Sequence, residues 1–145
     1  MSDRQRVVSL LPSATEILHF VSAGDSLIGV THECDYPSGV ETLPKLTSTP
    51  LDHHSMTSAE IDAAIGEHLT DTGSIYALDA ELLEELEPDL VLTQGLCDVC
   101  AVSLSVVERA TVGLTKAPRI LHPEVFPEAP EVRDALRLPG VAARR

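Results

Sequence analysis

The sequence predicts a parallel α/β fold, in which one sheet carries helices on both of its faces. Two observations lead to this class: short apolar runs recur at residues 7–11, 27–30 and 90–92, and helical patterns stand between them. Continuous apolar runs of this length are typical of strands that are covered on both faces. Their alternation with helices favours parallel strands joined by right-handed crossovers. The 145 residues are enough for one domain with its own core.

The chain opens with a strand, a helix and a second strand. Residues 7–11 are the first predicted strand, and residues 27–30 are the second. Between them lies a helical pattern in which Ser13 and Glu16 have the S-x-x-E spacing of a capping box, and Gly24 supplies the helix end. We therefore expect this helix to start close to Ser13.

A proline-rich loop and a second helix follow. Residues 37–57 combine prolines with many Ser and Thr, which predicts a loop with one short strand near Leu46. Thr57 and Glu60 then repeat the capping-box spacing, and they predict the start of a helix that ends before Gly73.

The second half of the chain repeats the alternation. Asp79 is the predicted cap of an acidic helix, and the strand at residues 90–92 follows it. A further helix is expected over residues 102–114, and a last short strand over residues 119–121.

Two regions of different character result from this pattern. Residues 1–122 are expected to form one α/β lobe. Residues 123–145 contain four prolines and one weak helical pattern, so we expect a weakly structured tail there.

Composition narrows the range of partners. The chain has 23 acidic against 10 basic residues, a net charge of −13. Nucleic acids and anionic membranes need clustered Lys and Arg, so neither is expected as a partner. An acidic surface with few lysines is halophile-like, and an ordinary acidic cytosolic protein is the alternative. The apolar run at residues 7–11 is too short for a signal core or a membrane span, which predicts a cytoplasmic protein without membrane insertion.

Polar and thiol side chains directly follow several of the predicted strands. In a parallel α/β sheet such loops meet at the carboxyl edge, where ligands bind. The side chains that we expect at this edge are Ser13, His32, Cys34, Asp35, Gln94, Cys97 and Cys100.

Cys97 and Cys100 have C-x-x-C spacing, which leaves three interpretations open. With Cys34 and His32 they form a Cys3His set, a legitimate composition for zinc. If the pair opens the helix at residues 102–114, the helix dipole lowers a thiol pKa and favours redox chemistry. The third interpretation is packing alone, because a single C-x-x-C does not decide between these roles.

An enzyme is not predicted. Ser13 stands at a strand-to-helix turn, where its hydroxyl either binds an anion together with the helix N-terminus or simply caps the helix. The sequence has no glycine-rich phosphate loop, no G-x-S-x-G elbow and no H-E-x-x-H. It also lacks a nucleophile and base at a recognised spacing, so a binding role is favoured.

Three strings, in this order along the chain, resemble a known family. Residues 6–16 read RVVSLLPSATE, residues 28–30 read IGV with CDYP at 34–37, and residues 86–92 read LEPDLVL. Together they resemble the vitamin B12 and iron-siderophore substrate-binding proteins of ABC importers. The HECDYP and LCDVCAVS strings are similar to a cobalamin-binding-protein-like subgroup.

The resemblance implies a fold, a ligand and a partner. It implies the N-terminal lobe of a helix-linked (class III) periplasmic binding protein, with cobalamin or a ferric chelate as ligand and importer membrane subunits as partner. Tyr36 would then lie at the mouth of the ligand cleft, and Glu81 would be the first-lobe residue that docks on the transporter. Family members usually work outside the cytoplasmic membrane and are about twice as long, so a truncated or split product with an absent second lobe is expected.

Overall fold

The computed structural model describes residues 4–51, 54–72, 74–97, 99–122 and 129–137, and it confirms the predicted parallel α/β fold. The main sheet has four strands in the order β2-β1-β5-β6, and every neighbouring pair is parallel. These strands are β1 (Val7–Ser9), β2 (Leu27–Val30), β5 (Leu90–Leu92) and β6 (Arg119–Leu121).

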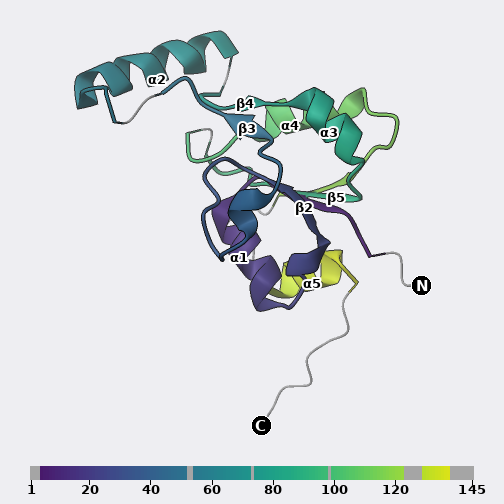
Figure 1. Cartoon of the computed structure of the whole chain (residues 1–145). Helices are drawn as coiled ribbons and strands as arrows, with labels where there is room; N and C mark the ends of the chain where they lie inside the picture. The colour runs from purple at the N-terminus through teal and green to yellow at the C-terminus, as the bar shows by residue number, and fades with distance from the viewer. Residues whose placement is uncertain (1–3, 52–53, 73, 98, 123–128, 138–145) are drawn as a thin grey trace.

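Helices cover both faces of this sheet (Figure 1). One face carries α1 (Pro12–Phe20) and α5 (Ala129–Ala135), which pack against each other. The other face carries α3 (Ala80–Leu86) and α4 (Leu104–Val112). The remaining elements are the short helices η1 (Gly24–Ser26) and η2 (Val40–Thr42), the helix α2 (Ser58–Thr72), and the antiparallel pair β3 (Thr47–Ser48) and β4 (Ala77–Leu78).

The strand side chains divide between two buried clusters. Val7, Leu90 and Leu92 belong to the cluster beneath α1 and α5, whereas Val8 and Val91 belong to the cluster beneath α3 and α4. Successive strand residues point to opposite faces, so each apolar run supplies both cores at once. This explains why the strand sequences are continuously apolar rather than alternating.

Two of the three predicted helix caps are confirmed. Thr57 donates its backbone N–H and hydroxyl to Glu60 Oε2 at 2.7 and 2.8 Å, and Glu60 N donates back to Thr57 Oγ1. The Asp79 carboxylate accepts from Leu82 N at 2.9 Å. These contacts satisfy backbone donors that the first turn of a helix otherwise leaves unpaired.

The predicted capping box at Ser13 is wrong. The helix α1 begins at Pro12, its N-cap is Leu11, and no side chain caps it. Proline at the first helical position has a fixed φ that suits a helix and lacks an N–H that would need a partner. Pro12 therefore moves the start of the helix ahead of Ser13, whose hydroxyl then lies within the first turn.

The expected weakly structured tail does not describe residues 129–136. Residues 123–128 and 138–145 lie outside the described part of the chain, but α5 packs on α1 and buries Val132 completely. Ala135 and Leu136 join the same core cluster. The helical pattern is weak because the helix is short, and its stability comes from packing rather than from propensity.

The loop after β2 is packed tightly onto that strand. A Cβ atom at Gly29 would lie 2.4 Å from Leu46 Cδ1 and 2.9 Å from Leu86 Cδ1, so any larger residue would force these two side chains to shift. Val30 N donates to Pro44 O, and Leu46 N donates to Val30 O, both at 2.9 Å. The segment leading into β3 thus runs beside β2, which brings Thr47 next to the residues that follow β2.

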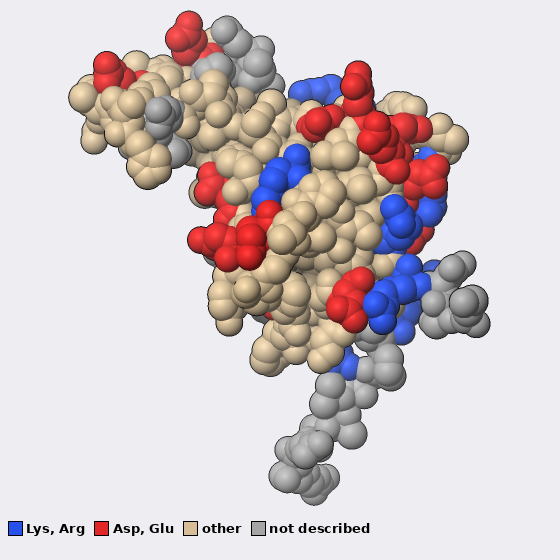
Figure 2. Space-filling view, in the orientation of Figure 1, with Lys and Arg blue, Asp and Glu red and all other residues tan. Residues whose placement is uncertain are grey.

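The helix α2 stands apart from the rest of the molecule in Figure 1. Its aliphatic residues Ile61, Ala64 and Ile65 are only half-buried. Among the helices that the structure describes, none is both long and apolar enough to cross a bilayer. Figure 2 shows Asp and Glu spread over one face, with Lys and Arg in smaller groups.

Candidate functional site

The carboxyl edge of the sheet keeps polar atoms without partners. Ser13 Oγ follows β1 and Thr93 Oγ1 follows β5, and both atoms are buried without a hydrogen-bond partner in the described structure. Thr93 as a whole is fully buried. An unpaired buried hydroxyl costs on the order of 1–3 kcal/mol. Such atoms at the edge where α/β folds bind ligands indicate a site for a polar molecule.

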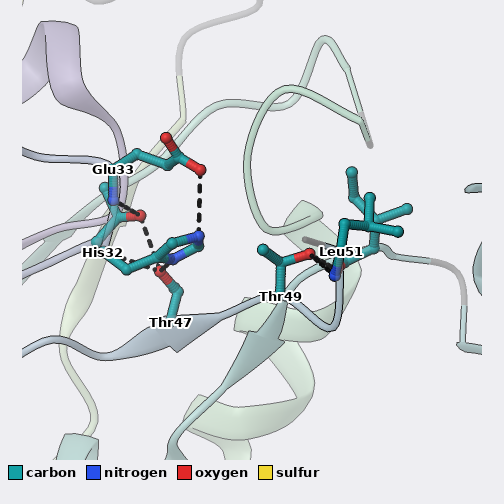
Figure 3. A network of polar contacts seen from close by, with 7 residues as sticks. His32, Glu33, Thr47, Thr49 and Leu51 are labelled. Carbon is teal, nitrogen blue, oxygen red and sulfur yellow. Dashed lines mark hydrogen bonds and ion pairs between the residues drawn. The ribbon is translucent and has the colours of Figure 1, made fainter. Parts of the chain in front are cut away.

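His32 is held at the end of β2 by a hydroxyl network (Figure 3). Thr47 Oγ1 lies 2.7 Å from His32 Nδ1 and 2.8 Å from Thr31 Oγ1, and it accepts from His32 N at 3.1 Å. A hydroxyl has one proton and two lone pairs, so these three contacts use its whole capacity. The Thr47 hydroxyl therefore fixes the orientation of the imidazole ring.

The other ring nitrogen faces a carboxylate. His32 Nε2 lies 3.1 Å from Glu33 Oε1, an ion-pair distance, but the carboxylate does not lie where a hydrogen bond would form. The His32 and Tyr76 rings have centroids 5.6 Å apart and are tilted by 48°. Burial is the largest cause that raises the pKa of Tyr76, and the negative charges of Glu33, Cys100 and Cys97 raise it further. Tyr76, which directly precedes β4, thus lies between the loops that follow β2 and β5.

Gln94 shapes the loop after β5. Its side chain is buried, and its Oε1 accepts from Leu96 N at 2.7 Å and from Cys97 N at 2.8 Å. Its Nε2 donates to the carbonyl oxygen of Cys97. Both ends of the amide are engaged within the loop, so Gln94 positions Cys97, and its direct role in ligand binding stays a prediction.

The two thiols of this loop are brought together. Cys97 Sγ and Cys100 Sγ are 2.9 Å apart, and Cys100 is exposed. The contact with Cys97 raises the pKa of Cys100, with burial as a smaller cause. The helix α4 starts only at Leu104, after Ser103 as N-cap. The lowered thiol pKa was expected only if the pair opens this helix, and the pair instead precedes it, so that condition is not met.

Cys34 turns to the opposite side of the sheet. It is buried in the cluster beneath α1, its Sγ lies 3.2 Å from Thr15 Oγ1, and burial raises the pKa of its thiol. The strand β1 stands between β2 and β5. Two strand spacings separate the loops by about 10 Å.

The predicted Cys3His zinc site is therefore wrong. Within the described residues no group of three or more His, Cys, Asp or Glu side chains is arranged to hold a metal ion. Zinc ligands must meet around one point at about 2.0 to 2.3 Å. Cys34 on the α1 side cannot satisfy this distance together with Cys97 and Cys100 across the sheet.

The other predicted residues are dispersed. Asp35 is exposed, and Tyr36 lies on a separate hollow of about 490 Å³ that is lined with Glu16 and Phe20 of α1. Glu81 is exposed on α3. The structure thus groups His32 with the thiol loop around Tyr76, and it places Tyr36 elsewhere. The ligand and docking roles of these residues remain predictions.

A groove beside the site was missed from the sequence. It has a volume of about 610 Å³ and is lined by residues 48–50, by residues 74–77, which include Tyr76, and by Val106 and Arg109 of α4. Thr47, Tyr76 and Thr93 were also missed. Thr93 had a signal, since it follows directly on a buried strand, and Tyr76 is one of only two tyrosines.

Comparison with known proteins points to one family. No protein-family model matches the chain. Over 44 residues the chain is 43% identical to the vitamin B12-binding protein of Vibrio vulnificus strain YJ016, a match that covers 30% of this chain and 16% of that protein. The periplasmic heme-binding protein HutB of Vibrio cholerae aligns with a TM-score of 0.55 at 15% identity, covering 93% of this chain and 42% of HutB. The periplasmic vitamin B12-binding protein BtuF of Vibrio cholerae aligns with a TM-score of 0.50 at 19% identity, covering 92% of this chain and 46% of BtuF.

These likenesses confirm two predictions. The resemblance to the vitamin B12 and iron-siderophore substrate-binding family is confirmed by the sequence match, and the class III periplasmic-binding fold by the structural alignments. The relatives are named as binding proteins, which agrees with the prediction that the chain is not an enzyme. The chain spans less than half the length of the solved structures that it matches.

Proposed function

We propose that this chain is a substrate-binding lobe for cobalamin or an iron chelate that supplies an ABC importer. The observation that carries the proposal is the carboxyl edge of the sheet. There Ser13 Oγ and Thr93 Oγ1 are buried without partners, beside the oriented ring of His32, in a fold that vitamin B12- and heme-binding proteins share.

The chemistry of this edge suits such ligands. Cobalamin carries amide groups around a flat ring, and ferric chelates present oxygen atoms around the metal. Unpaired hydroxyls donate to amide carbonyls and chelate oxygens alike. Ligand sites usually combine an apolar surface with a few placed polar groups, and a flat ligand with polar groups at its rim fits such a site.

Titration with cobalamin and a ferric chelate, followed by visible absorbance, tests the proposal. We expect saturable binding of one ligand class and about tenfold weaker binding by His32→Ala, the loss of roughly one charge-assisted or neutral hydrogen bond. The matched control is His19→Ala, which removes an exposed histidine from α1. The absence of saturable binding for both ligand classes would contradict the proposal.

Delivery to an importer requires an accessible acidic residue on this lobe. Glu81 and Glu85 are exposed on α3, whereas Glu84 accepts from Thr115 N at 3.1 and 3.2 Å and is engaged. We infer that Glu81 docks on importer arginines, and that the chain acts outside the cytoplasmic membrane. The periplasmic names of the relatives support this location over the cytoplasmic one.

A further inference from the structure

We propose that Cys97 and Cys100 form a covalent modification site, a dithiol that closes to a disulfide by exchange with a small-molecule disulfide. The site lies beside the proposed ligand edge, but the proposal does not depend on any ligand being bound there.

The geometry of the pair favours closure. The two Sγ atoms are 2.9 Å apart, whereas a disulfide holds its sulfur atoms at about 2.05 Å. A movement of less than about 1 Å therefore forms the bond. Both residues lie in one short loop, so no movement of the sheet or of a helix is needed.

Cys97 is also held in place by a buried side chain. Gln94 binds the backbone N–H and carbonyl of Cys97, and Gln94 itself is buried at the end of β5. Because Cys97 is already positioned, little conformational freedom is lost on closure. Cys100 is exposed, so a small disulfide in solution reaches its sulfur.

The third cysteine provides the contrast. Cys34 is only 3% exposed, and its sulfur contacts Thr15 Oγ1 in the core beneath α1. Because this sulfur is buried, a disulfide in solution does not reach it, whereas Cys100 is exposed. Oxidation is therefore expected at the surface pair and not at Cys34.

The reaction proceeds in two exchange steps. The Cys100 thiol loses a proton, and its thiolate attacks one sulfur of the external disulfide; that S–S bond breaks and one small thiol leaves. Cys97 then loses a proton and attacks Cys100 Sγ, which forms the Cys97–Cys100 bond and releases the second small thiol. Two protein thiols are oxidised, and one external disulfide is reduced to two thiols.

Oxidation of the whole chain in glutathione redox buffers tests the proposal. After acid quenching and alkylation, mass spectrometry of peptides should show a Cys97–Cys100 disulfide that has lost two hydrogens, with Cys34 alkylated. Cys34→Ser should close to the same extent, while Cys97→Ser should stop at a mixed disulfide on Cys100. Absence of the internal disulfide, or a stable mixed disulfide in the unchanged chain, would overturn the proposal.

A second measurement tests whether the fold favours disulfide closure beyond what any C-x-x-C sequence would show. The equilibrium constant for closure should be about tenfold larger in the folded chain than in urea, a difference of roughly 30 mV in reduction potential. Equal constants in the two conditions would show that the fold does not favour closure.

Tyr76 supplies an internal reporter of the same event. After burial and Glu33, the charges of Cys100 and Cys97 also raise the pKa of Tyr76, so we expect Tyr76 to lie near the pair; disulfides quench tyrosine emission. In a Tyr36→Phe chain, oxidation should lower the remaining emission. In a Tyr76→Phe chain, it should leave emission unchanged, and the reverse pattern would contradict the placement of the pair.

Discussion

The amino and carboxyl edges of the sheet treat their polar groups differently. At the amino edge, Asp89 Oδ2 accepts from Arg6 N at 2.7 Å, and Asp89 Oδ1 pairs with Lys116 at 2.6 Å. The Arg6 guanidinium donates to Leu86 O at 2.8 and 3.0 Å. At the carboxyl edge, Ser13 Oγ and Thr93 Oγ1 have no partner within the described residues.

Under the proposed function, this difference separates groups that stabilise the fold from groups that are available to a ligand. The paired groups at the amino edge link β1, β5 and α3 by hydrogen bonds. The unpaired buried groups at the carboxyl edge lower the free energy of unfolding. The same division is known in barrel folds, where one end of the strands stabilises and the other carries the site. Gln5 Oε1 is an exception, since it is buried without a partner near the amino end of β1.

The largest effect is expected from Thr47→Val, which removes the centre of a hydrogen-bond network at the carboxyl edge. The change removes the hydroxyl that holds His32 and Thr31, and Thr47 is only 6% exposed. We expect a loss of about 2 kcal/mol in the free energy of unfolding, because buried polar partners are left unsatisfied. Urea denaturation measures it, and Thr70→Val on exposed α2 should change little. If Thr47→Val and Thr70→Val had equally small effects, the Thr47 network would not stabilise the carboxyl edge as described.

Asp89→Asn tests the amino edge. The ion pair with Lys116 is lost, although the amide oxygen still accepts from Arg6 N, so we expect a loss of about 1 kcal/mol at neutral pH. Asp62→Asn on α2 is the control, since that side chain is exposed.

The same variant predicts a pH dependence with a definite sign. The Arg6 backbone N–H is the main cause that lowers the pKa of Asp89, and Lys116 contributes next. A lowered pKa in the folded state adds stability above the unfolded value of about 3.9, and this stability is lost as pH falls through the folded value. The stability curves of the unchanged chain and of Asp89→Asn should therefore converge in acid. Parallel curves from neutral pH into acid would contradict this assignment.

The smallest expected effect is a gain in stability. Thr93→Val replaces a fully buried, unpartnered hydroxyl by a methyl group of similar size, so we expect about 0.5 kcal/mol of added stability. The matched change Thr15→Val should lose stability, because Thr15 Oγ1 contacts Ser9 Oγ and Cys34 Sγ. If Thr93→Val also weakens ligand binding, the edge trades stability for function; a loss of stability would show that Thr93 has a structural role instead.

The strands were predictable from the sequence because burial on both faces leaves a continuous apolar signature. The runs at Val7–Ser9, Leu27–Val30 and Leu90–Leu92 appear where expected. The edge of the sheet followed from chain direction, so the loops that carry His32 and Cys97 were also predictable.

The side-chain directions in those loops were not predictable. The period-two rule applies within a strand, and it ends where the backbone becomes irregular, so nothing in the sequence showed that Cys34 turns toward Thr15. The contact between Thr47 and His32 joins residues fifteen positions apart through packing of the segment beside β2. The docking of Val132 on α1 is likewise a tertiary contact, which a weak local pattern does not reveal.

The strand order also sets the distance between the two loops that follow β2 and β5. The loops after β2 and β5 flank the start of α1, with β1 between them. A molecule that touches both loops must span about two strand spacings, roughly 10 Å. An amino acid or a bare metal ion is too small to bridge that width, whereas a flat macrocycle matches it. For the ligand proposed here, contact with both loops would therefore require a broad molecule, and the strand order sets that width.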